Sequence, residues 1–343
     1  MTPSVLVTGA AGFIGAHVAA ALADAGLEVV ASDRGGGEGL LGRLRHDRVA
    51  HFLVPRGVPF ELVDLADGHE VEALFARHRF DRVVHLAAQA GVRYSVEAPQ
   101  AFVQSNLVAF GHVLEACRRA GIEHLVYASS SSVYGAREEV PFREDDRADA
   151  PTSLYAATKR ANELMAHAYA HLHGLACTGL RFFTVYGPWG RPDMAYFDFA
   201  QRIRRGEPIT VYGRGELRRD FTYVDDIVEG VRRIAAQPCA ALGLSAPHVV
   251  FNIGHHEPVE VREFVTLLEA ALGRRAIVRY APVHRGDVPV TCADVTRLRE
   301  RTGFAPTTSL ADGLVSFARW LEAWDPLPVR AAAEPPSPSS PLG

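Results

Sequence analysis

Near the start of the chain lies Ser4-Val5-Leu6-Val7-Thr8-Gly9-Ala10-Ala11-Gly12-Phe13-Ile14-Gly15, a short apolar run that leads into glycine at every third position. The run predicts a β-strand over 4–8, and the alanine-rich stretch after it predicts a helix that ends near Gly26. Residues 27–32 predict a second strand, and Asp33 follows it. Glycines allow the backbone of such a turn to approach a pyrophosphate at a helix N-terminus. The order of strand, glycine turn, helix, strand and acid therefore predicts a dinucleotide-binding site.

Asp33 indicates which dinucleotide this site binds. A carboxylate at the end of the second strand accepts a hydrogen bond from the 2′-hydroxyl of a ribose, and it repels a 2′-phosphate. The sequence therefore favours NAD over NADP. Arg34 is the one neighbouring residue that argues in the other direction, because an arginine there can bind a 2′-phosphate.

Strands and helices continue to alternate beyond this unit. Apolar β-type runs at 60–63, 82–88 and 124–129 predict further strands, each followed by a helical pattern. The alternation predicts an α/β fold with a doubly wound parallel (Rossmann) sheet. Ligands of such sheets bind at the carboxyl ends of the strands. We therefore expect one edge of the sheet to bring together Gly9, Asp33, Asp64, Ala87 and Ser130.

The composition is that of a globular protein, with 343 residues, 48% of them hydrophobic and 22% charged, and a formal net charge of −4. A chain without a basic excess is not expected to bind nucleic acid. No apolar stretch is long enough to span a membrane, and the N-terminus lacks the basic region of a secretion signal. The wide spacing of Cys117, Cys177, Cys239 and Cys292 indicates reduced thiols and a cytoplasmic protein.

Lys159 is the single lysine among 36 basic residues. A lysine that persists in a chain otherwise built with arginine indicates that an ammonium group is needed at that position. It lies four residues after Tyr155 in a predicted helix, and positions i and i+4 share one helix face. A cation beside a phenol lowers the pKa of the phenol. The pair therefore predicts a tyrosine that exchanges protons with a ligand.

The motifs of this chain occur in an order that resembles the extended short-chain dehydrogenase/reductase family over roughly residues 4–322. They are Gly9-x-x-Gly12-x-x-Gly15, Asp64-Leu65, His85-Leu86-Ala87-Ala88, Ser105-Asn106-Leu107, Ser129-Ser130-x-x-Val133-Tyr134-Gly135 and Tyr155-x-x-x-Lys159. The resemblance implies a tightly bound NAD+. Its expected contacts are Gly9, Gly12, Phe13, Ile14, Gly15, Asp33, Arg34, Asp64, Leu65, Leu86, Ala87, Ala88, Asn106, Ser129, Tyr155 and Lys159.

A narrower resemblance concerns the branch of this family that epimerises UDP-glucuronate at C4. It is carried by Gly91-Val92-Arg93-Tyr94-Ser95, by residues 181–194 with Gly187-Pro188-Trp189-Gly190-Arg191-Pro192-Asp193-Met194, and by Gly286-Asp287-Val288-Pro289-Val290-Thr291. It implies an isomerase that forms UDP-galacturonate through a transient 4-keto intermediate, with NAD as a bound catalyst.

The same resemblance assigns the catalytic roles. Tyr155 would remove the proton of the sugar 4-hydroxyl, and Lys159 would lower the pKa of Tyr155 and bind the nicotinamide ribose. Ser130 would hydrogen-bond the same sugar oxygen, and its neighbours Ser131 and Ser132 could share this role.

Oxidation at C4 turns UDP-glucuronate into a β-keto acid, which loses CO2 easily. An epimerase of this substrate must therefore hold the carboxylate where the C5–C6 bond does not overlap the ketone π system. Arg191 suits this task because a guanidinium can bind a carboxylate through two parallel hydrogen bonds. Arg93 is a second candidate for the same task.

The nucleotide end of the substrate requires cations for its diphosphate and a slot for the uracil ring. The resemblance implies that Arg219 and Arg285 bind the diphosphate, with Thr184 and Asp287 also near the substrate. Val211 and Tyr212 are expected to form part of the uridine pocket. No metal site is expected, since His255-His256 is interpreted as loop polarity.

These features imply a division of the chain into two intimate domains. We expect the NAD-binding domain over 1–180, with 220–255 returning to it, and a smaller, interleaved α/β substrate-binding domain over 181–219 and 256–325. Residues 326–343 are expected to be a disordered tail, and 34–57 suggest no role. We expect Trp320 and Trp324 to pack in the core.

Other functions remain open at this level. UDP-glucuronate decarboxylase shares the substrate and the first step, but those enzymes resemble Thr-Ser-Glu-Val-Tyr-Gly, whereas Ser132 stands at the glutamate position here. Dehydratases carry Asp-Glu where this chain has Ser131-Ser132. UDP-galactose 4-epimerase is a further alternative. A non-enzymatic NAD-binding sensor is the fourth, although such proteins usually lack the tyrosine–lysine pair. The family also implies a homodimer formed by the helices around 98–119 and 153–173.

Overall fold

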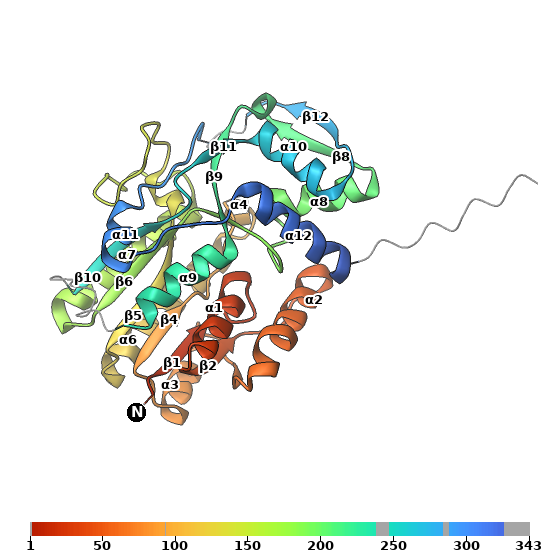
Figure 1. Ribbon diagram of the computed structural model, residues 1–343. Helices are drawn as coiled ribbons and strands as arrows, with labels where there is room; N and C mark the ends of the chain where they lie inside the picture. Colours follow the sequence, from red (N-terminus) through yellow and green to blue (C-terminus); the bar gives the residue numbers. More distant parts are fainter. Residues whose placement is uncertain (1, 93, 238–246, 284–287, 326–343) are drawn as a thin grey trace, which may run out of the picture.

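The computed structural model describes residues 2–92, 94–237, 247–283 and 288–325. Its centre is a seven-stranded sheet in the order β10-β6-β5-β4-β1-β2-β3, and every pair of neighbouring strands is parallel (Figure 1). The strands are β1 (Ser4–Thr8), β2 (Glu28–Asp33), β3 (Phe60–Leu62), β4 (Arg82–His85), β5 (His124–Ser130), β6 (Cys177–Phe182) and β10 (His248–Ile253). The predicted doubly wound parallel sheet is confirmed.

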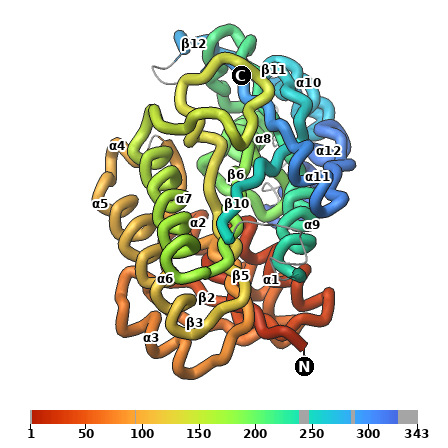
Figure 2. Tube along the Cα trace, turned by 90° about the vertical axis from the view of Figure 1, so that its left-hand side faces the viewer, coloured from red at the N-terminus to blue at the C-terminus, as the bar shows by residue number. Residues whose placement is uncertain are grey.

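Helices cover both faces of this sheet. Helices α1 (Phe13–Asp24) and α9 (Val224–Ala235) pack together on the face toward the viewer in Figure 1. Helices α3 (Gly68–Arg77), α6 (Ala109–Ala120) and α7 (Leu154–His173) cover the opposite face, which is turned toward the left-hand side in Figure 2. This arrangement buries both faces, as parallel sheets require.

Side chains of β1 alternate between the two resulting cores. Val5 and Val7 belong to the large core that includes α1 and α9, whereas Leu6 belongs to the second core, under α3 and α6. All three are fully buried. Because successive side chains of a strand point to opposite faces, an uninterrupted apolar run is what a strand covered on both faces needs.

The direction in which the chain crosses the sheet changes beside β1. From β1 the chain continues through β2 to β3 at one edge, and it then returns to β4 on the other side of β1. Connections therefore diverge at the carboxyl ends of β1 and β4, and a crevice forms at such a switch point. This places the glycine turn after β1 at the position where doubly wound sheets bind ligands.

The remaining strands form two small sheets beyond this edge (Figure 1). One has the order β11-β9-β7, and the other pairs β8 with β12. Their strands are β7 (Thr184–Tyr186), β8 (Pro208–Tyr212), β9 (Arg218–Tyr223), β11 (Pro258–Glu260) and β12 (Ile277–Ala281). Within residues 220–255, α9 and β10 lie with the main sheet, whereas Asp220–Tyr223 belong to β9 in the small sheet.

The other helices are short or belong to this second region. They are α2 (Gly39–Arg48), α4 (Tyr94–Glu97), α5 (Pro99–Phe102), α8 (Ala195–Arg205), α10 (Val261–Leu272), α11 (Thr296–Thr302) and α12 (Leu310–Trp324). Residues 34–57, which suggested no role, form α2 and a π-helical turn over Val49–Leu53 that continues it.

The last helix packs as predicted from its tryptophans. The rings of Trp320 and Trp324 stack with centroids 5.3 Å apart, and both contact the ring of Trp189. Trp324 Nε1 also donates a hydrogen bond of 2.8 Å to Asp47 in α2. Helix α12 is thereby tied to two segments that lie far from it in the sequence.

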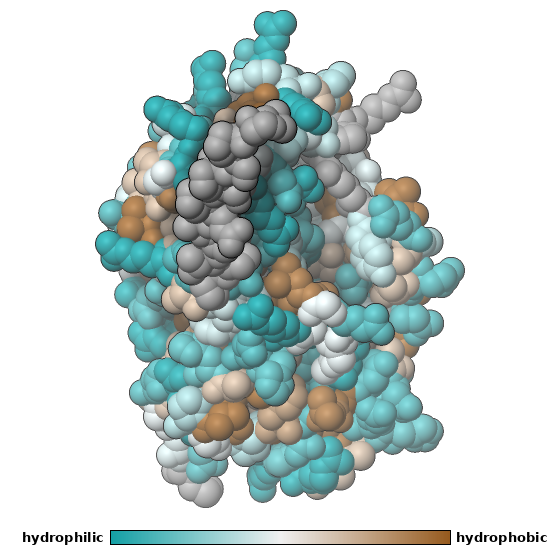
Figure 3. Space-filling view, turned by 90° about the vertical axis from the view of Figure 1, so that its right-hand side faces the viewer, coloured by the Kyte–Doolittle hydropathy of each residue, from teal (hydrophilic) through white to brown (hydrophobic). Residues whose placement is uncertain are grey.

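Polar groups dominate the face shown in Figure 3, where the apolar groups are scattered. Within the described ranges, none of the helices has the length and apolar character needed to cross a membrane.

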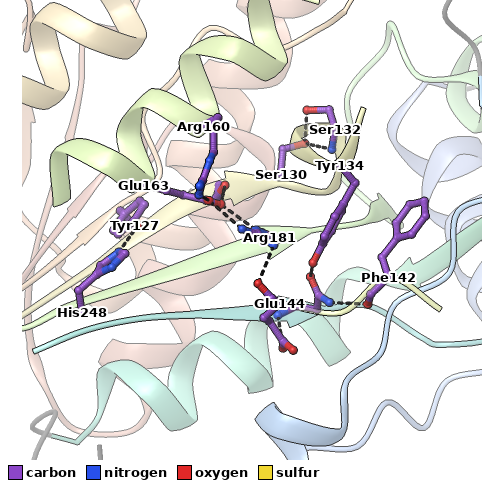
Figure 4. Close-up of polar contacts among 12 residues, drawn as sticks. Tyr127, Ser130, Ser132, Tyr134, Phe142, Glu144, Arg160, Glu163, Arg181 and His248 are labelled. Atoms are coloured by element: carbon purple, nitrogen blue, oxygen red, sulfur yellow. Dashed lines mark hydrogen bonds and ion pairs between the residues drawn. The ribbon is translucent and has the colours of Figure 1, made fainter. Parts of the chain in front are cut away.

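A buried ion pair joins α7 to the main sheet (Figure 4). Arg181 of β6 donates two hydrogen bonds of 2.8 Å to the carboxylate of Glu163 in α7. The side chains are only 3% and 1% exposed, so water does not screen the pair. Ser129 of β5 donates a third bond to Glu163, and Arg160 a fourth. Burial opposes ionisation of Glu163, but these donors hold its pKa below the ordinary value.

Removing one partner of this pair should cost more stability than removing both. We expect Arg181→Met to lower the free energy of unfolding by about 3 kcal/mol, because it leaves a buried carboxylate short of its main donor. The double variant Arg181→Met/Glu163→Leu should recover most of the loss, since no buried charge remains. Urea unfolding measures both, with Glu115→Gln on the surface as a control. Equal losses in the single and double variants would contradict this account.

Candidate functional site

The glycine turn after β1 fits closely against the rest of the sheet edge. Gly9 has a φ of 71°, and a Cβ on it would lie 2.6 Å from the backbone nitrogen of Ala87. A Cβ on Gly12 would lie 2.8 Å from the carbonyl oxygen of Gly9, and one on Gly15 would overlap that same oxygen. Side chains are therefore excluded at all three positions, and the backbone of the turn is left accessible to a ligand.

The N-terminus of α1 and the acid after β2 complete a site that fits a dinucleotide. Gly12 is the N-cap of α1, and no side chain caps this helix end. Its N–H groups are thus oriented toward an anion such as a pyrophosphate. Asp33 accepts hydrogen bonds from the backbone of Ala11 (3.1 Å) and of Gly35 (3.0 Å), so its carboxylate lies beside the turn. Arg34 is exposed.

The predicted residues after β3 and β4 line the same edge. Leu86 donates its backbone N–H to Thr8 of β1, and Ala87 donates to the Thr8 hydroxyl. Asp64 is exposed and its side chain accepts from the backbone of Ala66, while Leu65 is buried. Positions 64, 65, 86 and 87 therefore flank the glycine turn, where the sequence predicted cofactor contacts.

Asn106 connects this edge to the helix that carries Tyr155. Its side chain exchanges two hydrogen bonds with the backbone of Gln89, of 2.8 and 3.0 Å, and donates a third to Thr158 in α7. Thr158 in turn donates to the carbonyl of Tyr155. Asn106 is 2% exposed, and its amide is used to hold the loop after β4 against α7.

Tyr155 lies in the first turn of α7, facing the end of β5. Ser153 caps this helix by accepting a bond from Ala156, which sets where the helix begins. Burial raises the pKa of Tyr155 above its ordinary value, while hydrogen bonding with Ser130 and the positive charge of Arg191 act to lower it. A phenol, a serine hydroxyl and a guanidinium therefore share one position at the sheet edge.

Lys159 lies on the face of α7 that meets β5. The residue is 3% exposed, and its ammonium donates a bond of 2.9 Å to the carbonyl oxygen of Ala128 in β5. The lysine side chain therefore extends toward the strand, and Ser130 and Arg191 are groups that lower the pKa of Tyr155. Burial lowers the pKa of Lys159 itself to about 8.

Two further serines of the run after β5 have different surroundings. Ser129 points toward Glu163, to which it donates a bond of 2.6 Å. Ser132 donates a bond of 2.9 Å to the hydroxyl of Ser130 (Figure 4). Ser130 is thus the member of the run whose hydroxyl lies between the phenol of Tyr155 and a second hydroxyl.

Arg191 extends from the loop after β7 toward Tyr155. It binds the carboxylate of Asp193 through two bonds of 3.1 and 2.6 Å and donates a third bond to the carbonyl of Ala90. Its backbone N–H donates to the buried Tyr196 hydroxyl. Burial opposes the charge of Arg191, but the pairing with Asp193 raises its pKa. A guanidinium held in a plane beside a phenol is suited to a carboxylate ligand.

The remaining predicted substrate residues that the structure describes lie in the second region. Thr184 begins β7, and Val211 and Tyr212 end β8, where Val211 is buried. Arg219 is on β9, and its guanidinium donates to the carbonyl oxygens of Arg218 and Pro289. Arg93, Arg285 and Asp287 lie outside the described residues.

No group of three or more acidic, histidine or cysteine side chains is placed to hold a metal ion in the described part of the chain. His255 and His256 donate their backbone N–H groups to the buried carboxylate of Asp220. These contacts fix the loop after β10.

Three contributors to this region were not predicted. Asp193 pairs with Arg191, and it stands two residues away inside a stretch that the sequence analysis had quoted. Glu163 follows Lys159 by one helical turn, which is a signal that could have found it. Arg48 donates hydrogen bonds to the carbonyls of Ala11, Trp189 and Gly190, and no local pattern predicts partners so distant in the sequence.

The low pKa of Lys159 predicts a stability effect with a definite sign. The pKa falls from 10.5 to about 8 on folding, so the native state disfavours the charged form at pH 7. The shift corresponds to about 3 kcal/mol, and the bond to Ala128 offsets about 1 kcal/mol of it. We expect Lys159→Met to raise stability by about 2 kcal/mol at neutral pH.

The same linkage makes this gain depend on pH. Between pH 8 and 10.5 the unfolded chain binds more protons at Lys159, so the parent protein gains stability there and the advantage of the variant disappears. Thermal unfolding of both proteins at pH 7 and above pH 9, after removal of bound nucleotide, measures the difference. A methionine variant that is less stable than the parent at pH 7 would contradict the burial cost.

Curated relatives are similar to this chain over most of its length. The UDP-glucuronate 4-epimerase 1 of Arabidopsis thaliana is 47% identical over 330 residues, which cover 92% of this chain and 76% of the relative. A probable UDP-glucuronate 4-epimerase of Rhizobium meliloti (strain 1021) is 45% identical over 331 residues, covering 92% of this chain and 96% of the relative.

A solved structure leads to the same group of proteins. The crystal structure of a UDP-glucuronic acid 4-epimerase from Bacillus cereus, in complex with UDP-glucuronic acid and NAD, matches with a TM-score of 0.84 and 31% identity. The match covers 94% of this chain and 99% of that one. Residues 5–254, from β1 to the end of β10, match the family described as NAD dependent epimerase/dehydratase, and the chain belongs to this family.

Proposed function

We propose that this protein is an isomerase that converts UDP-glucuronate into UDP-galacturonate by inverting C4, with tightly bound NAD. NAD would supply a hydride acceptor and donor for C4, and residues 9–15 and Asp33 would hold it. The observation that carries the proposal is the placement of the Arg191 guanidinium, which is bonded to Ala90 after β4 and acts on the pKa of Tyr155. It puts a carboxylate-binding group next to a proton-exchanging one, at the edge of a sheet that fits a dinucleotide.

The protein's own groups supply the proton transfer. As a phenolate, Tyr155 would accept the proton of the 4-hydroxyl while the ketone forms, and as a phenol it would return that proton when the new alcohol forms. Ser130, which hydrogen-bonds the phenol, orients the same sugar oxygen. Lys159 contributes a buried cation beside Ala128 of β5, from which it would bind the nicotinamide ribose.

Arg191 protects the intermediate. Nε and Nη2 of Arg191 bind Asp193 and Ala90, so a substrate carboxylate would bind at Nη1 or displace Asp193. A guanidinium bound to that carboxylate restricts the rotation about the C5–C6 bond. Loss of CO2 requires that bond to align with the ketone π system. Asp193 and Ala90 already orient Arg191 on two sides, which supports a fixed rather than a freely rotating grip. Among the described residues this arrangement favours a sugar acid over a neutral sugar such as UDP-galactose.

The second region is assigned to the nucleotide part of the substrate. Arg219 and Arg285 would bind the diphosphate, near Thr184 and Asp287, and Val211 with Tyr212 would border the uracil. Val211 and Tyr212 end β8, which pairs with β12 and forms a separate small sheet. Arg93 remains the second candidate for the carboxylate.

We also propose a cytoplasmic homodimer formed by α6 and α7. Both helices already cover the sheet, yet Leu164 and Leu172 of α7 remain 55% and 71% exposed. Apolar side chains of this size on one helix support burial against a second copy. Cys117 and Cys292 carry free thiols, which fits a reducing compartment. A monomer mass in light scattering would rule the dimer out.

The direct test of the activity is a product assay. Purified protein incubated with UDP-glucuronate and no added NAD should form UDP-galacturonate, resolved by chromatography and NMR. Tyr155→Phe should retain bound NAD and lose about 10²–10⁴-fold in rate, the usual contribution of a general acid–base. Tyr169→Phe, on the same helix but away from the sheet edge, is a matched control. Equal turnover of Tyr155→Phe and parent would overturn the role of the phenol.

The protective role of Arg191 is tested by the distribution of products. Arg191→Met should raise the fraction of substrate that loses CO2, because the carboxylate is then free to rotate into alignment with the ketone. The yields of CO2 and UDP-pentose are compared with that of UDP-galacturonate for variant and parent. A variant that epimerises slowly but releases no more CO2 than the parent would reduce Arg191 to a binding residue.

A further inference from the structure

Arg48, at the end of α2, is a buried cation that the mechanism above does not use. Its side chain is 1% exposed, and burial lowers its pKa to about 10, so it is charged at neutral pH. Its three recorded hydrogen bonds all end on backbone carbonyl oxygens. Burying a charge without a paired carboxylate costs free energy, which suggests that its position serves a purpose other than stability.

The three carbonyls belong to the two loops of the site. Nη1 donates to Ala11 (3.2 Å), inside the glycine turn that fits the dinucleotide. Nε and Nη2 donate to Trp189 and Gly190, each at 2.8 Å, and these residues come directly before Arg191. One rigid guanidinium fork therefore spans from the cofactor loop to the loop that presents the candidate carboxylate-binding residue.

The loop of residues 187–193, which carries Arg191, needs the support of these hydrogen bonds. Trp189 has a φ of 62°, a left-handed conformation that costs a non-glycine residue about 1–3 kcal/mol. Its ring packs against His51 and Phe52, which follow Arg48, with centroids 4.8 and 5.9 Å away. Residues 48–52 thus hold both the backbone and the side chain of Trp189.

Tyr196 supports the same loop. Its buried hydroxyl accepts from the backbone of Arg191, and a Cβ on Gly190 would overlap it. The loop is therefore held by both Arg48 and Tyr196, and a shift of either contact changes where Arg191 points.

We infer that Arg48 is a positioning residue that couples the cofactor loop to the Arg191 loop and thereby sets how much of the 4-keto intermediate is epimerised and how much loses CO2. The inference rests on the proposed function. In the side reaction the C5–C6 bond breaks, CO2 leaves, the electron pair of that bond forms the enolate of the 4-ketone, and a proton taken up at C5 gives the 4-ketopentose. Arg48 acts through the backbone of Ala11, Trp189 and Gly190, to which its hydrogen bonds run.

The test compares Arg48→Lys with the parent. Lysine keeps the charge, but a compact ammonium cannot reproduce the fork that reaches both loops. We expect the epimerisation rate to fall about 10–100-fold, as a small misplacement of a positioned group does, and the ratio of CO2 to UDP-galacturonate to rise. Arg56→Met is the matched control, because Arg56 lies in the same segment but pairs with Asp24 on the surface. It should match the parent.

A second readout does not depend on activity. Hydrogen exchange followed by mass spectrometry should show faster exchange across residues 187–193 in Arg48→Lys than in the parent, and no change there in Arg56→Met. The same measurement applies to Arg48→Ala, which should also exchange faster across residues 187–193. Adding free guanidinium should slow that exchange, because the ion can fill the position that the side chain has left. Purely structural damage would instead speed exchange throughout the protein, and that result would overturn the inference.

The outcomes separate this inference from the function on which it rests. If the parent forms no UDP-galacturonate, the proposed function fails whatever Arg48 does. If the parent is active and Arg48→Lys gives the parent's ratio of products and the parent's exchange in the 187–193 loop, the coupling role of Arg48 is wrong.

Discussion

The carboxylate of Glu163 joins α7 and β5, the two elements that carry the candidate catalytic groups, to the neighbouring strand β6. It lies on α7 and accepts hydrogen bonds from Ser129 at the end of β5 and from Arg181 in β6. Ser130 follows Ser129 directly, and Lys159 and Tyr155 lie one and two turns before Glu163 on α7. A helix packed on a sheet by apolar contacts alone can slide or rotate, whereas a buried ion pair has one geometry. The alignment of hydroxyl, phenol and ammonium depends on this contact.

Lys159 and Arg48 are two buried cations of the site. In the contacts described above, neither of them hydrogen-bonds a carboxylate. Lys159 donates to Ala128, and Arg48 donates to Ala11, Trp189 and Gly190. Carbonyl oxygens satisfy their donors but do not neutralise their charges, so burial lowers the pKa of both groups. Proteins retain such costly charges mainly where function needs them. Both buried cations lie at the edge of the sheet. A negatively charged dinucleotide and a sugar acid bound there would provide the missing counter-charge.

The main features of the fold were predictable because they depend on local patterns. The glycine spacing, the apolar runs and the acid at Asp33 each occupy a few consecutive residues, and their order determines a doubly wound sheet. The association of Tyr155 with Ser130 was equally accessible, since both follow from motifs at the ends of adjacent elements.

What the sequence did not reveal depends on contacts between distant segments. Arg48 and Trp189 are 141 residues apart, and nothing within α2 distinguishes this arginine from its exposed neighbours. The direction of the Lys159 side chain could not be read from its i, i+4 spacing, because that spacing gives a helix face and not the strand that the face meets. Asp193 stands two residues from Arg191 in the sequence. Their pairing could not be predicted, because it depends on the backbone conformation of the loop that contains both residues.

The central claim is that C4 of the sugar loses and regains the same hydride while Tyr155 moves the proton. The most direct measurement uses UDP-glucuronate deuterated at C4, mixed with unlabelled substrate and incubated with the purified protein. This account predicts UDP-galacturonate that retains its deuterium at C4, with no exchange with solvent and no transfer to the unlabelled molecules. Loss of the label to water, or its appearance in the unlabelled pool, would contradict a hydride cycle confined to one active site.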